Sequence, residues 1–494
     1  MNYLSLFKKE IKPHKDAWII LIFVLVFILL RMPSLVEPYW YGDEGIYHVI
    51  GKAINSGRIL YQDIWDNKPP LLYYIYAIFN GEQFFVRLVS LVVGMFSVIS
   101  FYFLAKLFFL KRISILISSL IYVILFGTPI IEGNIANAEN FMHLPIILSA
   151  ILFLKFNKSQ KLSLIFISGL FLSVAFMLKT VAIFEFFAFG LLLFILRNGD
   201  IISSNFKNIL RFKKFIPEFL FLFGFIVIPI LFSFYFFSLN AFSDFWISVF
   251  SENIDYVGVE NEFIFPMGVL IIKIAITILI LGLVIVNKKR FTDKSLFIYL
   301  WLIFALFSTF FSQRPYFHYL LMSALPFSYF IGSIIESKKY RFFKISICVV
   351  VILISYLHFG IYKKTFLYYE NYISFLFYNK SVDSYYSFFD KNTPRDYELA
   401  RFITTFSEKE NDVFLWSDSG QIYALSNSLP PGKYIVAYHI TYYNNAVSYM
   451  LEQVSKAKPK YIIKTKDSVE LKQFLSSYIL KYKIGDSDIY ERQN

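Results

Sequence analysis

The chain has 494 residues, of which 57% are hydrophobic and 21% aromatic, and its mean hydropathy is +0.57. Ordinary soluble proteins are about 45–50% apolar, so this composition excludes a soluble enzyme and predicts an integral membrane protein. The net charge of +13 does not indicate a nucleic-acid partner, because Lys and Arg stand in short clusters between apolar runs. One cysteine, Cys348, excludes a disulfide framework or a cysteine-based metal site within one chain.

Eleven apolar runs are predicted to form membrane-spanning helices, since a span needs about 20 mostly apolar residues. No small-residue cleavage site follows the first run, so residues 1–16 are expected to remain as a cytoplasmic tail. The expected spans are 17–32, 85–109, 113–125, 141–156, 162–178, 181–196, 215–237, 265–286, 295–311, 319–335 and 345–359.

Positive charges are unequally distributed between the segments that connect these spans. With the N-terminus inside, the inner segments carry 23 Lys and Arg residues, and the outer segments up to residue 360 carry 7. Lys and Arg in short loops favour the cytoplasmic side. The sequence therefore predicts that the first outer loop, residues 33–84, and the segment 361–494 both lie outside the cytoplasm.

The first outer loop contains two adjacent carboxylates, Asp43 and Glu44, and the stretch EGIYHVIGKAINSG begins at Glu44. The apolar residues of this stretch recur at helical spacing and Gly57 is a stop signal, so we expect an amphipathic interfacial helix. Acidic groups are favoured at a helix N-terminus. Two interpretations stay open on position alone: simple helix capping, or a pair of carboxylates that takes part in chemistry.

The same loop ends in DNKPPLLYYIYAIF, where Lys68 precedes two prolines and an aromatic, apolar stretch. A lysine at the membrane interface acts as a point charge for phosphate, and the prolines restrict the backbone beside it. The alternative is a lysine that extends its ammonium group to the interface without further function, which is common at helix ends.

The second outer loop, TPIIEGNIANAENFMHLP, contains Glu132, Glu139 and His143 but no Lys or Arg. Glu139 and His143 are an i,i+4 pair, which would let both reach one metal ion on a helix. Two ligands fall short of a metal site. No cofactor therefore follows from the residues, although they leave room for a divalent metal ion.

Three further ionisable side chains are expected at the outer surface. Arg314 and His318 lie in the late loop SQRPYFHYLL, and Lys179 lies at the outer end of a span. Together with the acidic loops they predict an outer cavity with cations at the lipid boundary. Such a cavity suits an anionic lipid substrate and a neutral polar partner.

The segment 361–494 has the turn signals and short β-rich runs of a small globular domain. We expect strands in NDVFLWSD, SNSLPPGKYIVAY and KPKYIIKT, and a helix in NNAVSYMLEQVSKA. This alternation predicts a small α/β domain.

Five stretches together resemble a known family: GDEGIY, GRILYQDIWDNKPPLLYYIYAIF, FVRLVSLVVG, NAENFMHLP and RPYFHYLLMSALPFSYFIG. The chain resembles bacterial membrane glycosyltransferases of the GT-C fold, and more narrowly the group related to protein O-mannosyltransferases and lipid A aminoarabinose transferases. The resemblance covers roughly residues 1–360. It implies a polytopic α-helical GT-C domain over 17–360 with about 11 transmembrane helices, followed by a small extracytoplasmic α/β domain over 361–494.

The resemblance implies an inverting glycosyltransferase that moves a sugar, expected to be a hexose, from a polyprenyl-phosphate carrier to an acceptor hydroxyl. The acceptor would be a lipid, a glycan or a protein, and the reaction would take place on the outer face of a bacterial cytoplasmic membrane. The resemblance implies no nucleic-acid partner. It implies these roles: Asp43 as catalytic base with Glu44 as its partner; Lys68, Arg58, Arg314 and His318 at the carrier phosphate; Glu139 as the second-loop acid. Lys179 and His143 are further candidates for substrate contacts.

Two observations keep other functions open. The long loop from Leu239 to Ile264 is acidic and lacks Lys and Arg, whereas aminoarabinose transferases use basic groups near the phosphate. A lipid-linked sugar flippase or permease, or a polysaccharide polymerase or ligase, would also have many spans. A transporter should place its ionisable groups near the bilayer midplane, and the candidates here lie in outer loops.

Overall fold

The computed structural model describes residues 13–198, 215–254, 261 and 267–493, and it divides into two compact units. The membrane unit comprises Met1–Pro33, Val89–Ile228 and Val257–Thr365, and the mixed unit comprises Ser34–Leu88, Pro229–Tyr256 and Phe366–Asn494. Most of the expected N-terminal tail and part of the long acidic loop lie outside the described residues. The expected domain boundaries at residues 16 and 360 stay a prediction.

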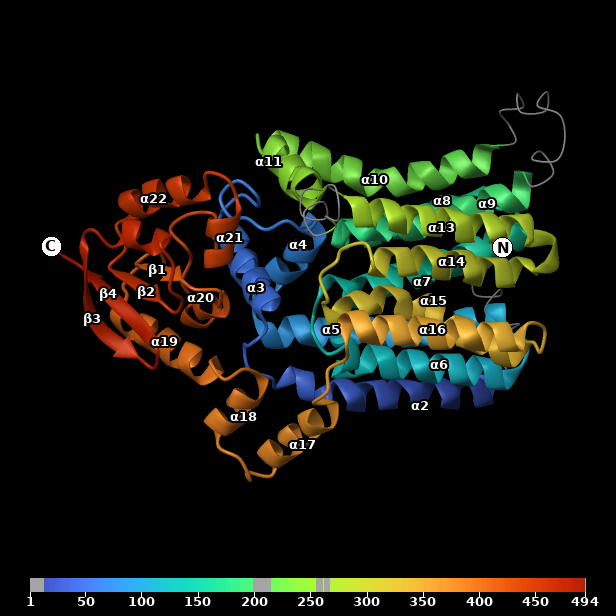
Figure 1. Cartoon of the computed structure of the whole chain (residues 1–494), viewed down its shortest axis with the longest axis horizontal. Helices are drawn as coiled ribbons and strands as arrows, with labels where there is room; N and C mark the ends of the chain where they lie inside the picture. Colours follow the sequence, from blue (N-terminus) through green and yellow to red (C-terminus); the bar gives the residue numbers. More distant parts are fainter. Residues whose placement is uncertain (1–12, 199–214, 255–260, 262–266, 494) are drawn as a thin grey trace. The chain divides into compact units, whose positions relative to one another are not determined.

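A helix stands at each of the eleven expected spans (Figure 1). They are α2 (Pro13–Arg31), α5 (Gln83–Phe108), α6 (Arg112–Gly127), α7 (Ala138–Ser159), α8 (Leu162–Leu178), α9 (Ile183–Asn198), α10 (Ile216–Ser238), α13 (Gly268–Val286), α14 (Asp293–Thr309), α15 (Leu320–Glu336) and α16 (Arg341–Phe359). Within the described residues, eight helices are long and apolar enough to cross a membrane, and α6 and α8 are shorter apolar helices. The prediction of a multi-pass membrane protein is confirmed.

Helices α8 and α10 cross at two glycines. A Cβ atom on Gly169 would collide with the backbone oxygen of Phe221, and one on Gly224 would collide with that of Phe166. Small residues let two helix backbones approach closely in a membrane protein, where packing rather than the hydrophobic effect holds helices together. The pair therefore sets the distance between these two helices.

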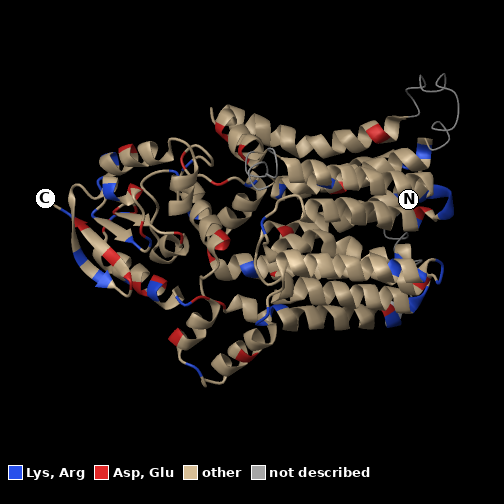
Figure 2. Ribbon diagram, viewed as in Figure 1, with Lys and Arg blue, Asp and Glu red and all other residues tan. Residues whose placement is uncertain are grey.

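The basic residues of the membrane unit gather at one end of its helices, which Figure 2 shows in blue. They lie in the connections between α5 and α6, α13 and α14, and α15 and α16, or in the adjoining helix turns: Lys106, Lys111, Arg112, Lys288, Lys289, Arg290, Lys338, Lys339 and Arg341. The short 3₁₀ segments of this unit are η2 (Pro129–Ile131), η3 (Thr180–Ala182), η8 (Lys288–Arg290) and η9 (Phe317–Tyr319), and η1 (Met32–Leu35) belongs partly to each unit.

The mixed unit joins the first loop to the C-terminal segment. The first loop supplies α3 (Gly42–Asn55) and α4 (Pro70–Ile78), and α11 (Phe242–Trp246) with the π-helix η7 (Ile247–Ser251) follows α10. The C-terminal helices are α17 (Thr365–Leu376), α18 (Val382–Phe389), α19 (Thr393–Phe406), α20 (Gln421–Ser426), α21 (Ala437–Tyr442), α22 (Ala446–Ala457) and the 3₁₀ segment η10 (Glu470–Phe474). The expected helices at 44–57 and in NNAVSYMLEQVSKA are confirmed as α3 and α22.

The C-terminal segment contains a four-stranded sheet of order β1-β2-β4-β3 (Figure 1). Strands β1 (Val413–Trp416) and β2 (Tyr461–Lys464) are parallel, with Val413 opposite Tyr461. Strand β4 (Ser487–Arg492) is antiparallel to both β2 and β3 (Tyr478–Ile484), and Gly485 has the positive φ of the tight turn between β3 and β4. A small α/β region is thus confirmed, and β1 and β2 stand where strands were expected.

The third expected strand, in SNSLPPGKYIVAY, is absent from the structure. Residues 427–436 form an irregular segment that leads into α21. Its backbone is satisfied elsewhere: Lys433 O accepts a hydrogen bond from Trp65 N, and Ala437 N donates to Ser417 O. The apolar run is buried, but these contacts replace the ladder of a strand.

The core of the C-terminal segment includes a residue of the first loop. Trp65 is 2% exposed and packs with Phe414, Trp416 and Tyr434, and its indole nitrogen donates to Ser248 Oγ at 2.8 Å. Helix α3 also packs against α20, where Gly45 leaves room for the backbone of Gln421. The polar face of α3, expected at the membrane interface, is therefore covered by protein: Glu44, His48 and Lys52 are all buried.

Candidate functional site

The first loop brings Asp43 and Lys68 together. Asp43 lies in the first turn of α3, Lys68 stands two residues before α4, and Lys68 Nζ is 3.6 Å from Asp43 Oδ2. Tyr47, one helical turn after Asp43, donates its hydroxyl to the same carboxylate oxygen at 3.1 Å and lies under the ammonium group of Lys68, 4.9 Å from the ring centroid. Both charged side chains keep access to solvent, at 32% and 23% exposure.

Lys68 is held from its other side by Asp66. Its Nζ is 3.6 Å from Asp66 Oδ2, and the Asp66 side chain is only 4% exposed. The backbone of Lys68 is also fixed, because its carbonyl accepts from the Tyr61 hydroxyl at 2.7 Å and its amide donates to the Tyr73 hydroxyl at 3.2 Å. The arrangement anchors the lysine and leaves its ammonium group able to exchange Asp43 for another anion.

Glu44 lies in a different environment from its neighbour. It is 1% exposed and forms an ion pair with Arg87 of α5, whose Nε donates to Glu44 Oε1 at 3.2 Å. Arg87 also binds Glu37 at 3.2 Å and the carbonyl of Ser34 at 2.7 Å. A fully desolvated, fully paired carboxylate orients the loop and does not take up a proton from a substrate, so we place Glu44 in a positioning role.

Helix capping does not account for the two carboxylates. The N-cap residue of α3 is Tyr41, and no side chain caps the helix there. Asp43 instead contacts Tyr47 and Lys68. Of the two interpretations left open by position, the structure favours the one in which Asp43 belongs to a site.

Arg58, expected at the carrier phosphate, contacts the C-terminal segment. Its guanidinium donates to Asn411 Oδ1 at 2.9 Å and to the carbonyl of Gly432 at 3.5 Å, and burial lowers its pKa. These contacts tie the end of α3 to the C-terminal segment. We therefore do not include Arg58 among the proposed phosphate-binding residues.

The membrane unit contains a second charged cluster around Glu139, at the start of α7. Glu139 is buried and pairs with Lys179, whose ammonium group lies 4.7 Å from the ring centroid of Tyr319. His318 Nδ1 contacts Glu132 Oε2 at 2.8 Å, and His318 Nε2 is 3.9 Å from Glu139. Three of the expected site residues, Glu139, Lys179 and His318, thus meet in one cluster, together with Glu132.

His143, the partner of Glu139 in the possible metal pair, is held by two hydrogen bonds. Both ring nitrogens of His143 have partners, the Tyr122 hydroxyl at 3.1 Å and the carbonyl of Leu321 at 3.0 Å. Arg314 is partly buried, and its amide donates to Ser312 Oγ at 3.2 Å. Within the described residues, no three His, Cys, Asp or Glu side chains are arranged to hold a metal ion.

Two residues of the site were not assigned a role from the sequence. Arg87 is a lone arginine at the start of an apolar helix, and such a charge signals a specific partner. Asp66 stands two residues before Lys68. Both signals were present in the sequence, but the partners on which their roles depend became visible only in the fold.

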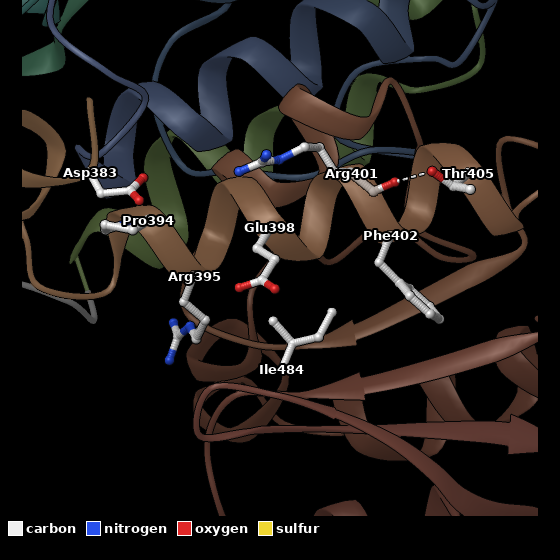
Figure 3. A pocket seen from close by; sticks show the side chains of 8 residues that line it. All are labelled: Asp383, Pro394, Arg395, Glu398, Arg401, Phe402, Thr405 and Ile484. Atoms are coloured by element: carbon white, nitrogen blue, oxygen red, sulfur yellow. Dashed lines mark hydrogen bonds between the residues drawn. The ribbon is translucent and has the colours of Figure 1, made fainter. Parts of the chain in front are cut away.

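The C-terminal segment also has a surface pocket of about 580 Å³ (Figure 3). Arg395, Glu398, Arg401 and Phe402 of α19 line it together with Ile484 at the end of β3. Arg395 is already paired with Asp396 and Asp486, both at 2.8 Å. None of the lining residues is among those expected at the site.

Comparisons with known proteins give one sequence match and several structural ones. Residues 67–232 match the profile of the family described as dolichyl-phosphate-mannose-protein mannosyltransferase. A comparison with curated proteins finds no match.

Among solved structures, ArnT from Cupriavidus metallidurans bound to undecaprenyl phosphate superposes with a TM-score of 0.52 and 12% identity, over 97% of this chain and 98% of that one. The apo oligosaccharyltransferase of Archaeoglobus fulgidus gives a TM-score of 0.46 and 12% identity over 92% of this chain and 70% of that one. The predicted GT-C fold is confirmed. The chain is a multi-pass membrane protein with the GT-C fold that ArnT also has, and its residues 67–232 match the profile of the protein mannosyltransferases.

Proposed function

We propose that this protein transfers a sugar, a hexose, from a polyprenyl-phosphate carrier to an acceptor hydroxyl with inversion at the anomeric carbon. Lys68 binds the carrier phosphate and Asp43 is the general base. The observation that carries the proposal is the ion pair between these two side chains, since both are reachable from solvent while Asp66 and Glu44 beside them are buried.

Substrate binding begins with an exchange of ion-pair partners. The 3.6 Å gap between Lys68 Nζ and Asp43 Oδ2 is too small to hold a sugar ring. The phosphodiester of the carrier takes the place of Asp43 at Lys68, while Asp66 and the fixed backbone keep the lysine in position. Loss of the cation makes the Asp43 carboxylate more basic at the moment when a base is required.

The transfer of the sugar then needs no general acid. The acceptor oxygen attacks the anomeric carbon and gives its proton to Asp43, and the bond from that carbon to the phosphate oxygen breaks. The electron pair leaves on the polyprenyl phosphate, which becomes a monoester with one more negative charge. Lys68 stabilises that charge, which is the electrostatic contribution expected of a preorganised cation, and general-base assistance contributes about 10²- to 10⁴-fold.

The donor class is supported by what the similar proteins are named for. The matching family is named for a dolichyl-phosphate mannose donor, and the ArnT structure contains undecaprenyl phosphate. On this chain we propose a hexose on a polyprenyl monophosphate, with a lipid, glycan or protein acceptor. The cluster of Glu139, Lys179 and His318 in the membrane unit supplies further candidates for head-group contacts.

We place the reaction on the outer face of a bacterial cytoplasmic membrane, with the C-terminal segment on the same side. The support is the gathering of Lys and Arg at one end of the membrane helices (Figure 2), which favours the cytoplasm there. Residues 361–494 then follow α16 on the opposite side.

The test is transfer of label from radiolabelled undecaprenyl-phosphate hexoses in membranes that contain wild-type protein or Asp43→Asn. Label should leave the carrier and appear in product with wild type alone. If no donor loses label, and the exposure of lipid-linked sugar to external reagents changes with expression, the flippase interpretation replaces this one. Label arriving from a diphosphate-linked oligosaccharide instead would indicate a polymerase or ligase.

A further inference from the structure

A histidine of the C-terminal segment lies beside the Lys68 site. His439, in α21, packs edge to face on Trp65, with ring centroids 5.0 Å apart. Trp65 directly precedes Asp66, whose carboxylate is 3.6 Å from Lys68 Nζ. His439 and Lys68 are 371 positions apart in the sequence, and the fold of the mixed unit brings them to the same place.

The ring of His439 has a polar atom that the described residues leave without a partner. The side chain is 7% exposed, and its Nδ1 is buried with no hydrogen-bond partner among the described residues. Asp66 Oδ2, also buried, lies 3.6 Å from the ammonium group of Lys68. Buried polar atoms are almost always satisfied in folded proteins. The unpartnered Nδ1 of His439, whose ring contacts the residue before Asp66, therefore indicates a place for a polar ligand.

The charge state of His439 indicates which chemical group it would bind. Burial lowers the pKa of the ring to about 4, even though the nearby carboxylates of Asp66 and Asp43 oppose that shift. The imidazole is therefore neutral at neutral pH, with one nitrogen as donor and one as acceptor. A neutral ring of this kind suits a hydroxyl group, whereas a phosphate is better matched by the adjacent lysine.

We propose that His439 hydrogen-bonds a hydroxyl group of the sugar that the polyprenyl phosphate carries. The inference rests on the proposed function, because it takes Lys68 as the phosphate site. A sugar joined to a phosphate at Lys68 would lie next to that lysine, because its anomeric carbon is one oxygen atom away from the phosphorus. The C-terminal segment then supplies part of the sugar site. The aromatic contact between His439 and Trp65 holds the histidine in place.

The test compares two lipids, undecaprenyl phosphate with and without a hexose, for binding to the full-length protein in nanodiscs. His439→Phe keeps an aromatic ring on Trp65 and removes both nitrogens. We expect it to weaken binding of the sugar-loaded lipid about 5- to 10-fold, as for one lost hydrogen bond, and to leave binding of the bare lipid unchanged. His439→Asn, whose amide can occupy the place of Nδ1, should restore most of the loss.

Tyr442→Phe, on an exposed residue of the same helix, is the matched control and should behave as wild type. An equal loss for both lipids, or no loss for either, overturns the inference. Should His439→Phe lower the thermal midpoint, His439→Leu is measured with the same two lipids. A wild-type protein that neither binds the loaded lipid nor transfers its sugar refutes the proposed function itself, whereas an active wild type matched by His439→Phe refutes only the role of His439.

Discussion

Asp43 and Glu44 are adjacent in the sequence, yet their side chains are 32% and 2% exposed. One step along an α-helix turns a side chain by about 100°. Asp43 is therefore directed to the open side with Lys68, and Glu44 to the buried side with Arg87. The same acidic motif supplies one residue for chemistry and one that holds the loop.

Replacing Asp43 by Asn removes the proposed general base and keeps a side chain of nearly the same shape. We expect the rate of transfer to fall at least 10²-fold, with donor binding retained because Lys68 is released from its ion pair. Single-turnover transfer and donor binding, measured on the same preparation, check this. Transfer at the wild-type rate would remove Asp43 from the mechanism.

Replacing Lys68 by Ala removes the cation for the phosphate. We expect donor binding to weaken about 10- to 100-fold, in line with the strength of a charge-assisted contact. Lys68→Arg is the control, since it keeps the charge and should retain most of the affinity. Equal donor affinity for Lys68→Ala and wild type would show that the phosphate binds elsewhere.

Replacing Glu44 by Gln should affect stability first. Arg87 would lose the carboxylate of its strongest pair while it remains buried, and breaking a buried ion pair costs about 3–5 kcal/mol. Glu37 still faces Arg87, so the lower end of that range applies. We expect a lower thermal midpoint for Glu44→Gln and an unchanged one for Asp43→Asn, and equal midpoints in both variants would contradict the positioning role.

At the scale of single elements, the crossing of α8 and α10 depends on two glycines that face each other's backbone. Close approach of helices is a packing property, so a single added side chain should separate them. Such a change should alter the free energy of unfolding and leave the chemistry of the proposed site unaffected.

Gly169→Leu is expected to destabilise the protein by about 1–3 kcal/mol, the usual cost of overpacking. Gly282→Leu in α13 is the matched control, since a Cβ atom there meets nothing within 4 Å. Thermal unfolding in detergent, followed by tryptophan fluorescence, compares the two. Equal midpoints would show that α8 and α10 do not cross at these residues.

At the scale of the whole molecule, the distribution of Lys and Arg predicts the side of the membrane for each loop. Lys339, between α15 and α16, and Glu398, in α19, are both exposed and are expected on opposite sides.

The test uses single cysteines at Lys339 and Glu398 in a background with Cys348→Ser. A membrane-impermeant maleimide should label Glu398→Cys in intact cells, and it should label Lys339→Cys only after the membrane is opened. The reverse pattern would invert the topology and move the proposed reaction to the cytoplasmic side.

Much of the secondary structure could be read from the sequence. Apolar runs of span length must form helices in a bilayer, because each backbone group has to be satisfied within its own segment. Strands β1 and β2 and helix α22 also follow from local patterns. The hairpin of β3 and β4 was missed, although Gly485 and the alternating run before it indicate a turn between strands. The expected strand at SNSLPPGKYIVAY was wrong, because Trp65 and Ser417 supply its backbone partners.

Composition, periodicity and local spacing are properties of neighbouring residues, so they suffice to predict the membrane class, the span positions and the two charged residues of the first loop. Which charges are exposed and which are buried depends on the folded arrangement. The pairing of Glu44 with Arg87, the engagement of Arg58 with Asn411 and the approach of His439 to Trp65 join residues that lie between 43 and 374 positions apart. Such contacts depend on how buried surfaces pack in three dimensions, and no local pattern in the chain encodes them.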